Sequence, residues 1–385
     1  MSDLRERFDA ADRIPVDDVW PSVRARLHDG AQPVVLVEPA IDVRPAGWRR
    51  ALLIAAVLVL SVAAVLVVVR AFDRVGSRVP AAGGAFAKVQ GWITYTSNGN
   101  IFAVDPATIG SQSPDTVELF DGAPGSAWAV GWSRDGSRLL IARARIGGPS
   151  AQRTPADIDL YLLDGSGSPT PVTSDGMSTA GSIAPDGSVV FEEQVSSAGG
   201  VVGTRIVRVV PSTGERTVIS SSADGVDWGP SVSPDGSSIA LFHVASDANG
   251  VGGAISLDLM GSDGSGRRSI VGSDALPAVT DVSGVSWSPD GTRLAFGLYT
   301  QDHALEVYVV NADGSGLARI ATDAAFPSWS PDGGRISFSR GDTLFTMDPQ
   351  GGHVLDTGVS LVDPGGNGWS ARAGSWNPVP ATRLP

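Results

Sequence analysis

The sequence predicts an all-β fold: a six-bladed β-propeller of four-stranded blades, preceded by one transmembrane α-helix and a short polar N-terminal tail. Two observations carry this prediction. A turn motif of the Ser-Pro-Asp-Gly type recurs along most of the 385-residue chain, and a single uninterrupted apolar run precedes it. The abundance of glycine (48) and proline (26) is typical of a chain with many tight turns.

Composition excludes several classes of protein. The formal net charge of −13 argues against a nucleic-acid surface, which needs clustered positive charge. There is no cysteine, so disulfides, thiolate metal sites and a lipid-modified cysteine anchor are all excluded.

The polar N-terminal tail, residues 1–47, contains short stretches with apolar residues at helical spacing. In one of them, Trp20, Val23 and Leu27 fall on one side of a predicted amphipathic helix that starts near Pro21. Two interpretations stay open. The tail is either mostly disordered with transient helix, or it is a partner-binding segment whose apolar face is buried only on a cytoplasmic regulator.

Residues 48–70 are predicted to form the transmembrane helix, with an apolar core at 51–69. At 1.5 Å rise per residue this core spans about 28 Å, close to the hydrocarbon thickness of a bilayer. Tryptophan and arginine flank the core as interfacial anchors do. A cleaved signal peptide is the competing interpretation, because Ala85-Phe86-Ala87 has the form of a cleavage site. That site lies far beyond the apolar run, so an uncleaved single-span anchor is favoured.

The orientation of the anchor cannot be taken from charge, because three arginines lie on each side of it. An N-terminal anchor with a long domain behind it usually keeps its short tail in the cytoplasm. We therefore expect a single-pass protein of the plasma membrane with a cytoplasmic N-terminus and an extracytoplasmic propeller. Residues 71–89, rich in small residues and proline, are predicted to be a flexible linker.

The repeat itself occupies residues 90–380. Its turn motif occurs five times, and the gaps between successive turn aspartates are blade-sized, 51, 49, 55 and 42 residues. Proline presets φ in such a turn, aspartate bonds its own backbone, and glycine takes the positive φ. We therefore interpret these residues as structural: Asp135, Gly136, Asp186, Gly187, Asp235, Gly236, Asp290, Gly291, Asp332 and Gly333.

Apolar residues alternate after each turn, at the two-residue period of a half-buried strand. In the third unit, Val189 and Phe191 come one position early, which predicts a shortened hairpin. Six third-strand motifs face only five complete turn motifs, and the unit at residues 91–97 lacks its inner strand. The missing piece returns near the end of the sequence as Ser375-Trp376-Asn377-Pro378. Residues 374–378 are thus expected to pair beside 91–97 and close the ring, which removes exposed strand edges.

The repeated SWSPDG…LAF…VYVVNADGSG pattern, quoted from residues 286–316, resembles the propeller repeat of TolB and related WD-repeat-like bacterial propellers. The resemblance covers about residues 90 to 380. It implies a six-bladed extracytoplasmic propeller that acts by binding rather than by catalysis. The domain that precedes the propeller in TolB is missing, with the anchor in its place, so a role in the Tol complex is not implied.

Signals for chemistry are weak. No Gly-x-Ser-x-Gly elbow occurs, the four histidines are widely spaced, and no cofactor or metal is predicted. The stretch from Asn311 to Ser315 faintly resembles a calcium loop, but a hairpin turn is the better interpretation because every unit has one there. The protein is not expected to be an enzyme.

Ligand contact is expected on the face opposite the turn motifs, where irregular loops are predicted at residues 143–157, 194–204, 244–254 and 300–304. Trp128 and Trp228 each lie seven residues before a turn aspartate, near this face. They could stack on a flat or sugar-like ligand, although packing between blades is the alternative. His243, Asp302 and His303 could line the rim, or could be solvated loop residues.

The function predicted from these features is a membrane-anchored, extracytoplasmic β-propeller that binds a protein, peptide or glycan of the cell envelope. The alternative is a transmembrane signal transducer. Its layout of tail, anchor and exported domain resembles that of anti-sigma factors, although the cysteine-histidine zinc motif of many of them is missing. An enzyme on the irregular rim is the third and weakest hypothesis.

Overall fold

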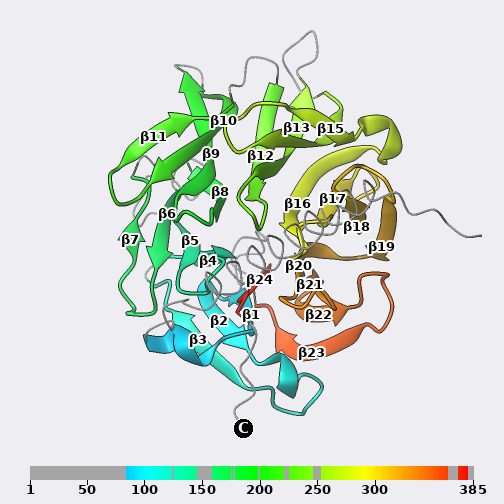
Figure 1. Cartoon of the computed structure of the whole chain (residues 1–385). Coiled ribbons are helices and arrows are strands. Elements are labelled where there is room, and N and C mark those ends of the chain that lie inside the picture. The colour runs from blue at the N-terminus through cyan, green and yellow to red at the C-terminus, as the bar shows by residue number, and fades with distance from the viewer. Residues whose placement is uncertain are drawn as a thin grey trace, which may run out of the picture. The chain divides into compact units, whose positions relative to one another are not determined.

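The computed structural model describes residues 84–144, 158–220, 225–245, 253–362 and 372–379, except for single positions 124, 175, 177, 198 and 199. Within these residues the chain forms six four-stranded sheets, arranged as blades around a common axis (Figure 1). The prediction of an all-β six-bladed propeller of four-stranded blades is confirmed. The predicted tail and transmembrane helix, residues 1–47 and 48–70, lie outside the described residues. Among the residues described, no helix is long and apolar enough to cross a membrane.

Apart from one strand of blade one that comes from residues 372–376, the first three blades lie between the start of the described chain and residue 218. Blade one is built from β24 (Arg372–Trp376), β1 (Ile93–Ser97), β2 (Asn100–Val104) and β3 (Thr116–Phe120). Blade two is built from β4 (Ala127–Trp132), β5 (Leu139–Ala144), β6 (Ile158–Leu163) and β7 (Thr170–Pro171). Blade three is built from β8 (Ser178–Ile183), β9 (Val189–Ser197), β10 (Gly200–Val210) and β11 (Glu215–Val218).

The other three blades follow in chain order. Blade four is built from β12 (Gly225–Val232), β13 (Ser238–Ala245), β14 (Ile255–Gly261) and β15 (Arg268–Val271). Blade five is built from β16 (Val279–Trp287), β17 (Arg293–Thr300), β18 (Leu305–Asn311) and β19 (Ala318–Thr322). Blade six is built from β20 (Ala325–Trp329), β21 (Ile336–Arg340), β22 (Thr343–Met347) and β23 (Leu355–Ser360).

The core lies between neighbouring blades, because alternate residues of each second strand face opposite neighbours. The phenylalanines of four successive second strands are fully buried: Phe191, Phe242, Phe296 and Phe338. Phe242 of blade four meets Phe296 of blade five edge to face, with ring centroids 5.9 Å apart. Each blade is thus stabilised by the apolar face of the next, and the ring depends on all six.

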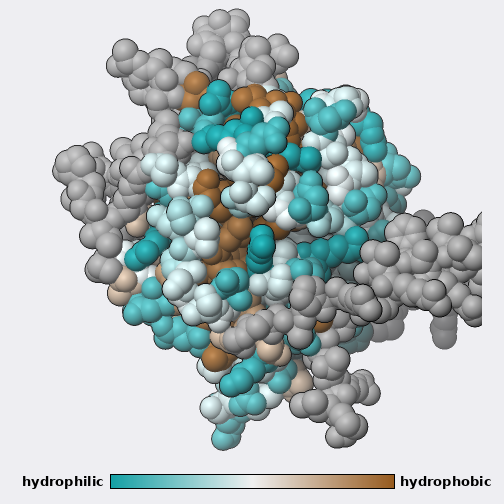
Figure 2. All heavy atoms as spheres, turned by 60° about the vertical axis from the view of Figure 1, so that its left-hand side comes forward, coloured by the Kyte–Doolittle hydropathy of each residue, from teal (hydrophilic) through white to brown (hydrophobic). Residues whose placement is uncertain are grey.

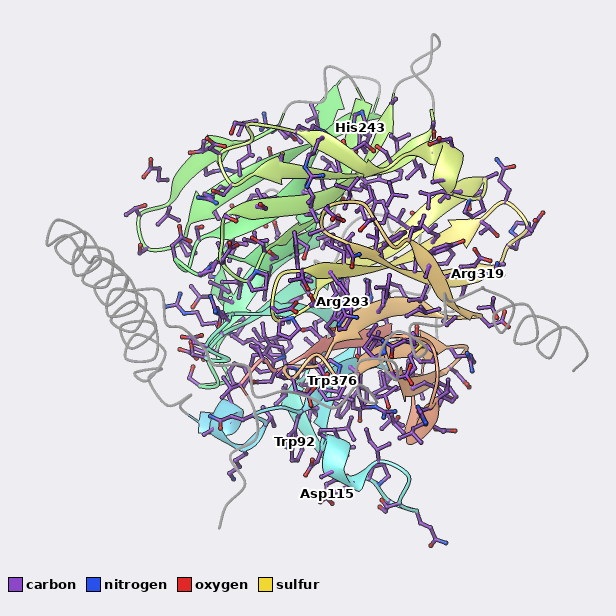
Figure 3. All side chains as sticks on the ribbon, turned by 45° about the vertical axis from the view of Figure 1, so that its right-hand side comes forward. Trp92, Asp115, His243, Arg293, Arg319 and Trp376 are labelled. Carbon is purple, nitrogen blue, oxygen red and sulfur yellow. The ribbon has the colours of Figure 1, made fainter. Side chains whose placement is uncertain are left out.

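Two strands from distant parts of the sequence close the ring in blade one. β24 pairs antiparallel with β1, with Ile93 opposite Trp376, and the Asn377 amide donates to the Trp92 carbonyl at 2.8 Å. Figure 3 shows Trp92 and Trp376 near one another at this junction. The closing strand begins at Arg372, two residues before the expected range of 374–378.

The hairpin of blade three is one residue shorter than the others, as its sequence predicts. Ile183 pairs with Val189 across five residues, whereas Trp287 pairs with Leu294 across six in blade five. At the other end of this blade, the predicted irregular loop 194–204 is instead mostly strand, because β9 continues to Ser197 and β10 starts at Gly200. Loop residues 145–157 and 246–252 are not among those described.

Within the described ranges, three short 3-10 helices accompany the sheets: η1 (Gly84–Lys88), η2 (Pro106–Thr108) and η5 (Ser273–Ala275). η1 lies within residues 71–89, which the sequence predicts to be a flexible linker. The structure differs from this prediction at residues 84–89, which pack on the propeller. Phe86 and Val89 are buried, and the Phe86 ring meets Trp132 edge to face with centroids 4.7 Å apart. Residues 84–89 therefore belong to the propeller, because Phe86 offers a large apolar side chain that a linker of small residues would lack.

The outermost strands form the perimeter of the ring. All four residues of β11 are exposed, including Val218. Figure 2 turns the blades on the left of Figure 1 forward and shows mostly hydrophilic side chains, with apolar ones visible between them. Strands from all six blades converge at the two ends of the axis.

Candidate functional site

One end of the axis carries the Asp-Gly turns, and we call it the turn face. In blade five, the Ser288 hydroxyl donates to Asp290 Oδ1 at 2.6 Å, and the same oxygen accepts from the Thr292 amide at 3.0 Å. The Arg293 amide in turn donates to the Ser288 hydroxyl at 2.9 Å. These bonds, above all that from Ser288, hold the pKa of Asp290 below its ordinary value.

The same geometry recurs in blades two, four and six, where a serine two positions before the turn aspartate donates to it. Blade three has Ala184 at that place and uses Ser188 instead. The turn aspartates therefore shape hairpins. Asp313 likewise accepts from the Ser315 amide and hydroxyl, at 2.8 and 2.7 Å, so the faint calcium-loop stretch is a hairpin turn in this structure.

The opposite end of the axis is where the innermost strands begin, and we call it the mouth. Six side chains from five blades, which we call the mouth cluster, lie on strands at this end: Trp128, Glu192, Asp281, Tyr299, Phe326 and Arg372. Trp128, Asp281, Phe326 and Arg372 lie within the first three residues of β4, β16, β20 and β24. The repeat places these four residues at the mouth, because the innermost strand of each blade starts at the mouth and ends at the turn face.

Arg372 occupies the cationic side of the mouth cluster. Its guanidinium carbon lies 4.9 Å from the ring centroid of Trp128 in blade two and 5.2 Å from that of Phe326 in blade six. A cation over an aromatic face is attracted by the ring quadrupole. Burial lowers the pKa of Arg372 to about 10, so the side chain remains a cation at neutral pH.

Glu192 and Asp281 occupy the acidic side. Glu192 accepts from the Thr179 hydroxyl at 2.7 Å and from the Gly229 amide of blade four at 2.9 Å. Burial raises the pKa of Glu192, and the negative charge of Asp281 raises it further. Asp281 is exposed to solvent near the start of β16, but partial desolvation by the groups around it raises its own pKa.

Tyr299 connects the acidic and cationic sides. Burial raises the pKa of its phenol, the charge of Asp281 adds to this, and the charge of Arg372 opposes it. Asp281 therefore acts on both Glu192 and Tyr299, and Arg372 acts on Tyr299. The mouth thus offers one cation, two acids, a phenol and two aromatic rings, a set suited to binding a polar polypeptide. Among the described residues, no group of three or more His, Asp or Glu side chains could hold a metal ion.

The five residues predicted to bind a ligand do not converge. Trp128 belongs to the mouth cluster, but its side chain is buried and the guanidinium of Arg372 lies over its ring. Trp228 is half-buried and packs against the core between blades four and five. Asp302 and His303 are exposed on the turn between β17 and β18, where His303 has a positive φ of 61°.

His243 lies in a buried charge network of blade four, away from Trp376 in Figure 3. Its Nδ1 is 2.9 Å from Asp227 Oδ1, and Arg267 donates to both oxygens of Asp227 at 2.7 and 3.0 Å. The Ser220 hydroxyl, which follows the last strand of blade three, donates to Asp227 at 2.6 Å. The network therefore connects blade three to blade four, and the bond to Asp227 fixes the orientation of the His243 ring.

Sequence reasoning missed five members of the mouth cluster. Phe326 carried a signal, because it is an aromatic residue six positions before a turn aspartate, close to the spacing of Trp128 and Trp228. Glu192, Asp281 and Tyr299 carried none, because only the ring brings them together. The partner-binding tail residues, Trp20, Val23 and Leu27, lie outside the described residues.

Comparisons with known proteins agree with the fold. No family model matches the chain, and no curated protein sequence matches it. Among solved structures, TolB from Acinetobacter baumannii aligns with a TM-score of 0.54 and 16% identity, over 80% of this chain and 70% of that one. An Agrobacterium tumefaciens protein assigned as TolB aligns with a TM-score of 0.50 and 20% identity, over 74% of this chain and 91% of that one.

A third similar structure is that of a nidogen/laminin complex, with a TM-score of 0.52 and 10% identity, over 74% of this chain and 97% of that one. At these identities the likeness concerns the fold alone. The chain is a six-bladed β-propeller with TolB-like structural neighbours.

Proposed function

We propose that the protein is a non-catalytic binding module that takes a protein or peptide at the mouth of its propeller. The observation that carries this proposal is the mouth cluster, in which five blades place opposite charges and aromatic rings at one end of the axis. Charged groups of both signs suit a polypeptide better than a neutral glycan, which remains the alternative ligand. One structural neighbour, the nidogen/laminin structure, is a complex of two proteins, which supports a recognition role.

The proposed setting follows from the sequence. The apolar run 51–69 anchors the protein in the plasma membrane by a single span, and the propeller faces outside the cytoplasm. Its partner is then a protein or peptide of the cell envelope. This setting rests on residues outside the described ranges.

The test is site-specific photocross-linking with the full chain in its own cells. A photoreactive residue at position 302, exposed beside the mouth, should capture one partner, and the same residue at position 138 on the turn face should not. Replacing Asp281 with Asn in the first version should reduce that capture about fivefold, because the charge that faces Glu192 and Tyr299 is removed. The matched control is Asp263→Asn, an exposed aspartate of a blade-four turn. Equal capture from both positions, or no effect of Asp281→Asn, would contradict the proposal.

The second function, a transmembrane transducer, rests on the amphipathic tail. A cross-linked pull-down should compare the full chain with a version that lacks residues 2–46. Loss of a cytoplasmic regulator with the tail would support signalling, with the propeller as sensor. If both versions capture the same envelope partners and neither captures a cytoplasmic protein, the result would support an anchored recognition module instead.

A further inference from the structure

The turns of neighbouring blades pack on one another at the turn face, and one of these contacts is looser than two others. A Cβ added to Gly236 would lie 3.0 Å from a proline ring of blade three, and one added to Gly333 would lie 3.4 Å from a proline ring of blade five. Between blades four and five, a Cβ added to Gly291 would lie 3.7 Å from the Pro234 ring. The turns of blades four and five therefore leave more space between them.

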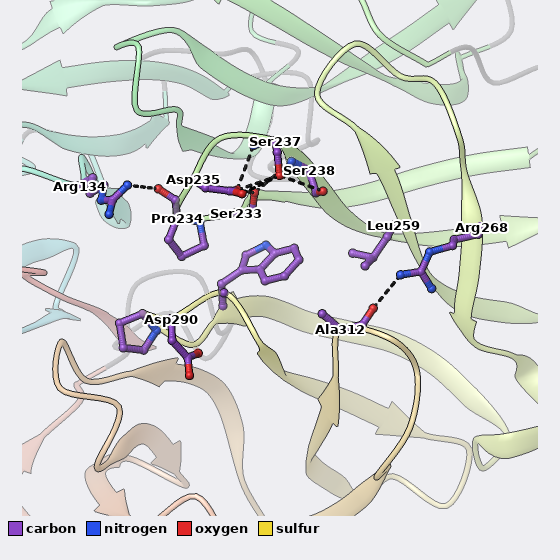
Figure 4. A pocket seen from close by; sticks show the side chains of 13 residues that line it. Arg134, Ser233, Pro234, Asp235, Ser237, Ser238, Leu259, Arg268, Asp290 and Ala312 are labelled. Atoms are coloured by element: carbon purple, nitrogen blue, oxygen red, sulfur yellow. Dashed lines mark hydrogen bonds between the residues drawn. The ribbon is translucent and has the colours of Figure 1, made fainter. Parts of the chain in front are cut away.

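A cavity of about 290 Å³ lies in this space, and apolar side chains line part of it (Figure 4). The indole nitrogen of Trp287 in blade five donates to the carbonyl oxygen of Ser231 in blade four at 3.0 Å, which holds the ring in place. Leu259 of blade four is buried beside it. The volume is at the small end for ligand pockets and suits a compact ligand rather than a large cofactor.

The cavity also has two cations, Arg134 and Arg268, and both side chains are exposed. Arg134 Nη1 donates to the carbonyl oxygen of Pro234 at 2.6 Å, and Arg268 Nη2 donates to that of Ala312 at 2.8 Å. Neither guanidinium donates a hydrogen bond to a carboxylate of the described residues. Because a guanidinium can hold a carboxylate by two parallel bonds, the cavity has the donors to bind an anionic group.

One carboxylate of the cavity has an open oxygen. The turn bonds of Asp290 all go to its Oδ1, and its Oδ2 accepts no hydrogen bond from the described residues. Asp235 differs, because its Oδ1 and Oδ2 lie 2.9 and 2.8 Å from the Ser237 hydroxyl. The turn bonds of Asp290, above all that from Ser288, hold its pKa below the ordinary value. Asp290 is therefore an anion at neutral pH, with one oxygen open to a cationic ligand group.

The open anion and the cation of blade four lie apart. Figure 4 shows Asp290 and Arg268 on opposite sides of the cavity. A ligand that pairs with both needs a positive group at one end, a negative group at the other and an apolar part between them. In a free amino acid only one carbon atom separates the two charged groups. Each further residue adds at most about 3.6 Å, so a short peptide fits this arrangement better.

We propose that the turn-face cavity binds a short zwitterionic peptide with apolar side chains. The ammonium group of the peptide pairs with Asp290 Oδ2, its carboxylate pairs with the Arg268 guanidinium, and one apolar side chain lies on the Trp287 indole. The cavity shares no residue with the mouth cluster and lies on the opposite face. The proposal therefore goes beyond the proposed function and does not depend on it.

The first test titrates the purified full chain with the dipeptide leucyl-leucine and measures the heat of binding. N-acetyl-leucyl-leucine lacks the ammonium group and leucyl-leucine amide lacks the carboxylate, so each should bind about fivefold more weakly. Free leucine should also bind about fivefold more weakly, because it cannot reach both charges. No binding of leucyl-leucine up to about 10 mM, or equal binding of the capped peptides, would overturn the proposal.

The second test assigns each end of the peptide to its partner. Asp290→Asn keeps an acceptor oxygen for the turn and should weaken leucyl-leucine about fivefold, without changing the binding of N-acetyl-leucyl-leucine. Arg268→Gln should likewise weaken leucyl-leucine but not leucyl-leucine amide. The matched controls, Asp263→Asn and Arg138→Gln, change exposed residues outside the cavity and should have no effect. Unchanged leucyl-leucine binding in both cavity variants would mean that the peptide binds elsewhere, which would overturn the proposal.

Discussion

The guanidinium of Arg372 lies 4.9 Å from the ring centroid of Trp128, and this contact joins the strand that closes the ring to blade two. Phe326 of blade six takes the other side of the same cation at 5.2 Å. The closing strand is therefore held by its β1 pairing and also by both neighbouring blades. This relationship makes Arg372 a stability residue as well as a member of the mouth cluster.

Replacing Arg372 with Met should lower the free energy of unfolding by about 2 kcal/mol, because two cation–π contacts at a partly desolvated site are lost. Chemical denaturation followed by circular dichroism measures this change. Arg138→Met, an exposed arginine in the turn of blade two, is the control and should change stability little. If both variants lose the same amount, the aromatic contacts do not stabilise the ring.

Gly136→Ala and Gly187→Ala form a matched pair for the turn face. Both glycines have a positive φ, 64° and 83°, so both substitutions should lose about 1 kcal/mol from backbone strain. A Cβ at Gly136 would also lie 2.6 Å from Asn377 Oδ1, whereas at Gly187 no described atom lies within 4 Å. We expect Gly136→Ala to lose about 1 to 2 kcal/mol more of its free energy of unfolding than Gly187→Ala does. The difference between the unfolding midpoints of the two variants measures this extra loss. Equal losses would show that the end of β24 does not press on blade two.

Ser288→Ala tests the turn hydrogen bonds. The variant loses the bond from Ser288 to Asp290 and leaves the Arg293 amide without its acceptor, so about 1 to 2 kcal/mol of stability should be lost. Ser269→Ala, on the exposed strand β15, should be neutral. Thermal unfolding of the two variants side by side gives the comparison, and a neutral Ser288→Ala would mean that water replaces the serine.

Asp227→Asn tests the link between blades three and four. Burial alone would raise the pKa of Asp227, but hydrogen bonds from Arg267, Ser220 and His243 outweigh it and hold that pKa below the ordinary value. At neutral pH the substitution should lower stability by about 3 kcal/mol, because a buried partner of Arg267 is removed.

The pH dependence of this loss has a fixed sign. A carboxyl whose pKa is lowered by folding contributes stability above its unfolded pKa, about 4, and this contribution is lost as pH falls through the folded value. The gap between the wild type and Asp227→Asn should therefore be largest near pH 7 and shrink below about pH 4. A gap that widens in acid would show that the carboxylate is not the stabilising form.

The architecture could be predicted because its signals are local and repeated. A Pro-Asp-Gly turn requires nothing outside itself, and even the early Val189 and Phe191 indicated the shortened hairpin of blade three. The pairing of Trp376 beside Ile93 could be foreseen from one missing inner strand. The role of Phe86 was missed, because one aromatic residue among small ones gives no periodicity to read.

The candidate site could not be predicted to the same degree. Glu192 and Asp281 lie 89 positions apart, and their charges interact only because blades three and five face the same axis. Loop residues such as Asp302 and His303 drew notice by their chemistry, yet nothing in the pattern fixes where an exposed loop points.

The pairing of β24 with β1 also sets the order in which the protein can be completed during synthesis. Every blade except the first can assemble from contiguous strands as the polypeptide leaves the ribosome. Blade one must wait for residues 372–376, so until then the edge of β1 has no partner strand. A truncation or a translational pause shortly before Arg372 would leave five complete blades and an unpaired edge on β1. Such a species would be prone to aggregation and to chaperone binding.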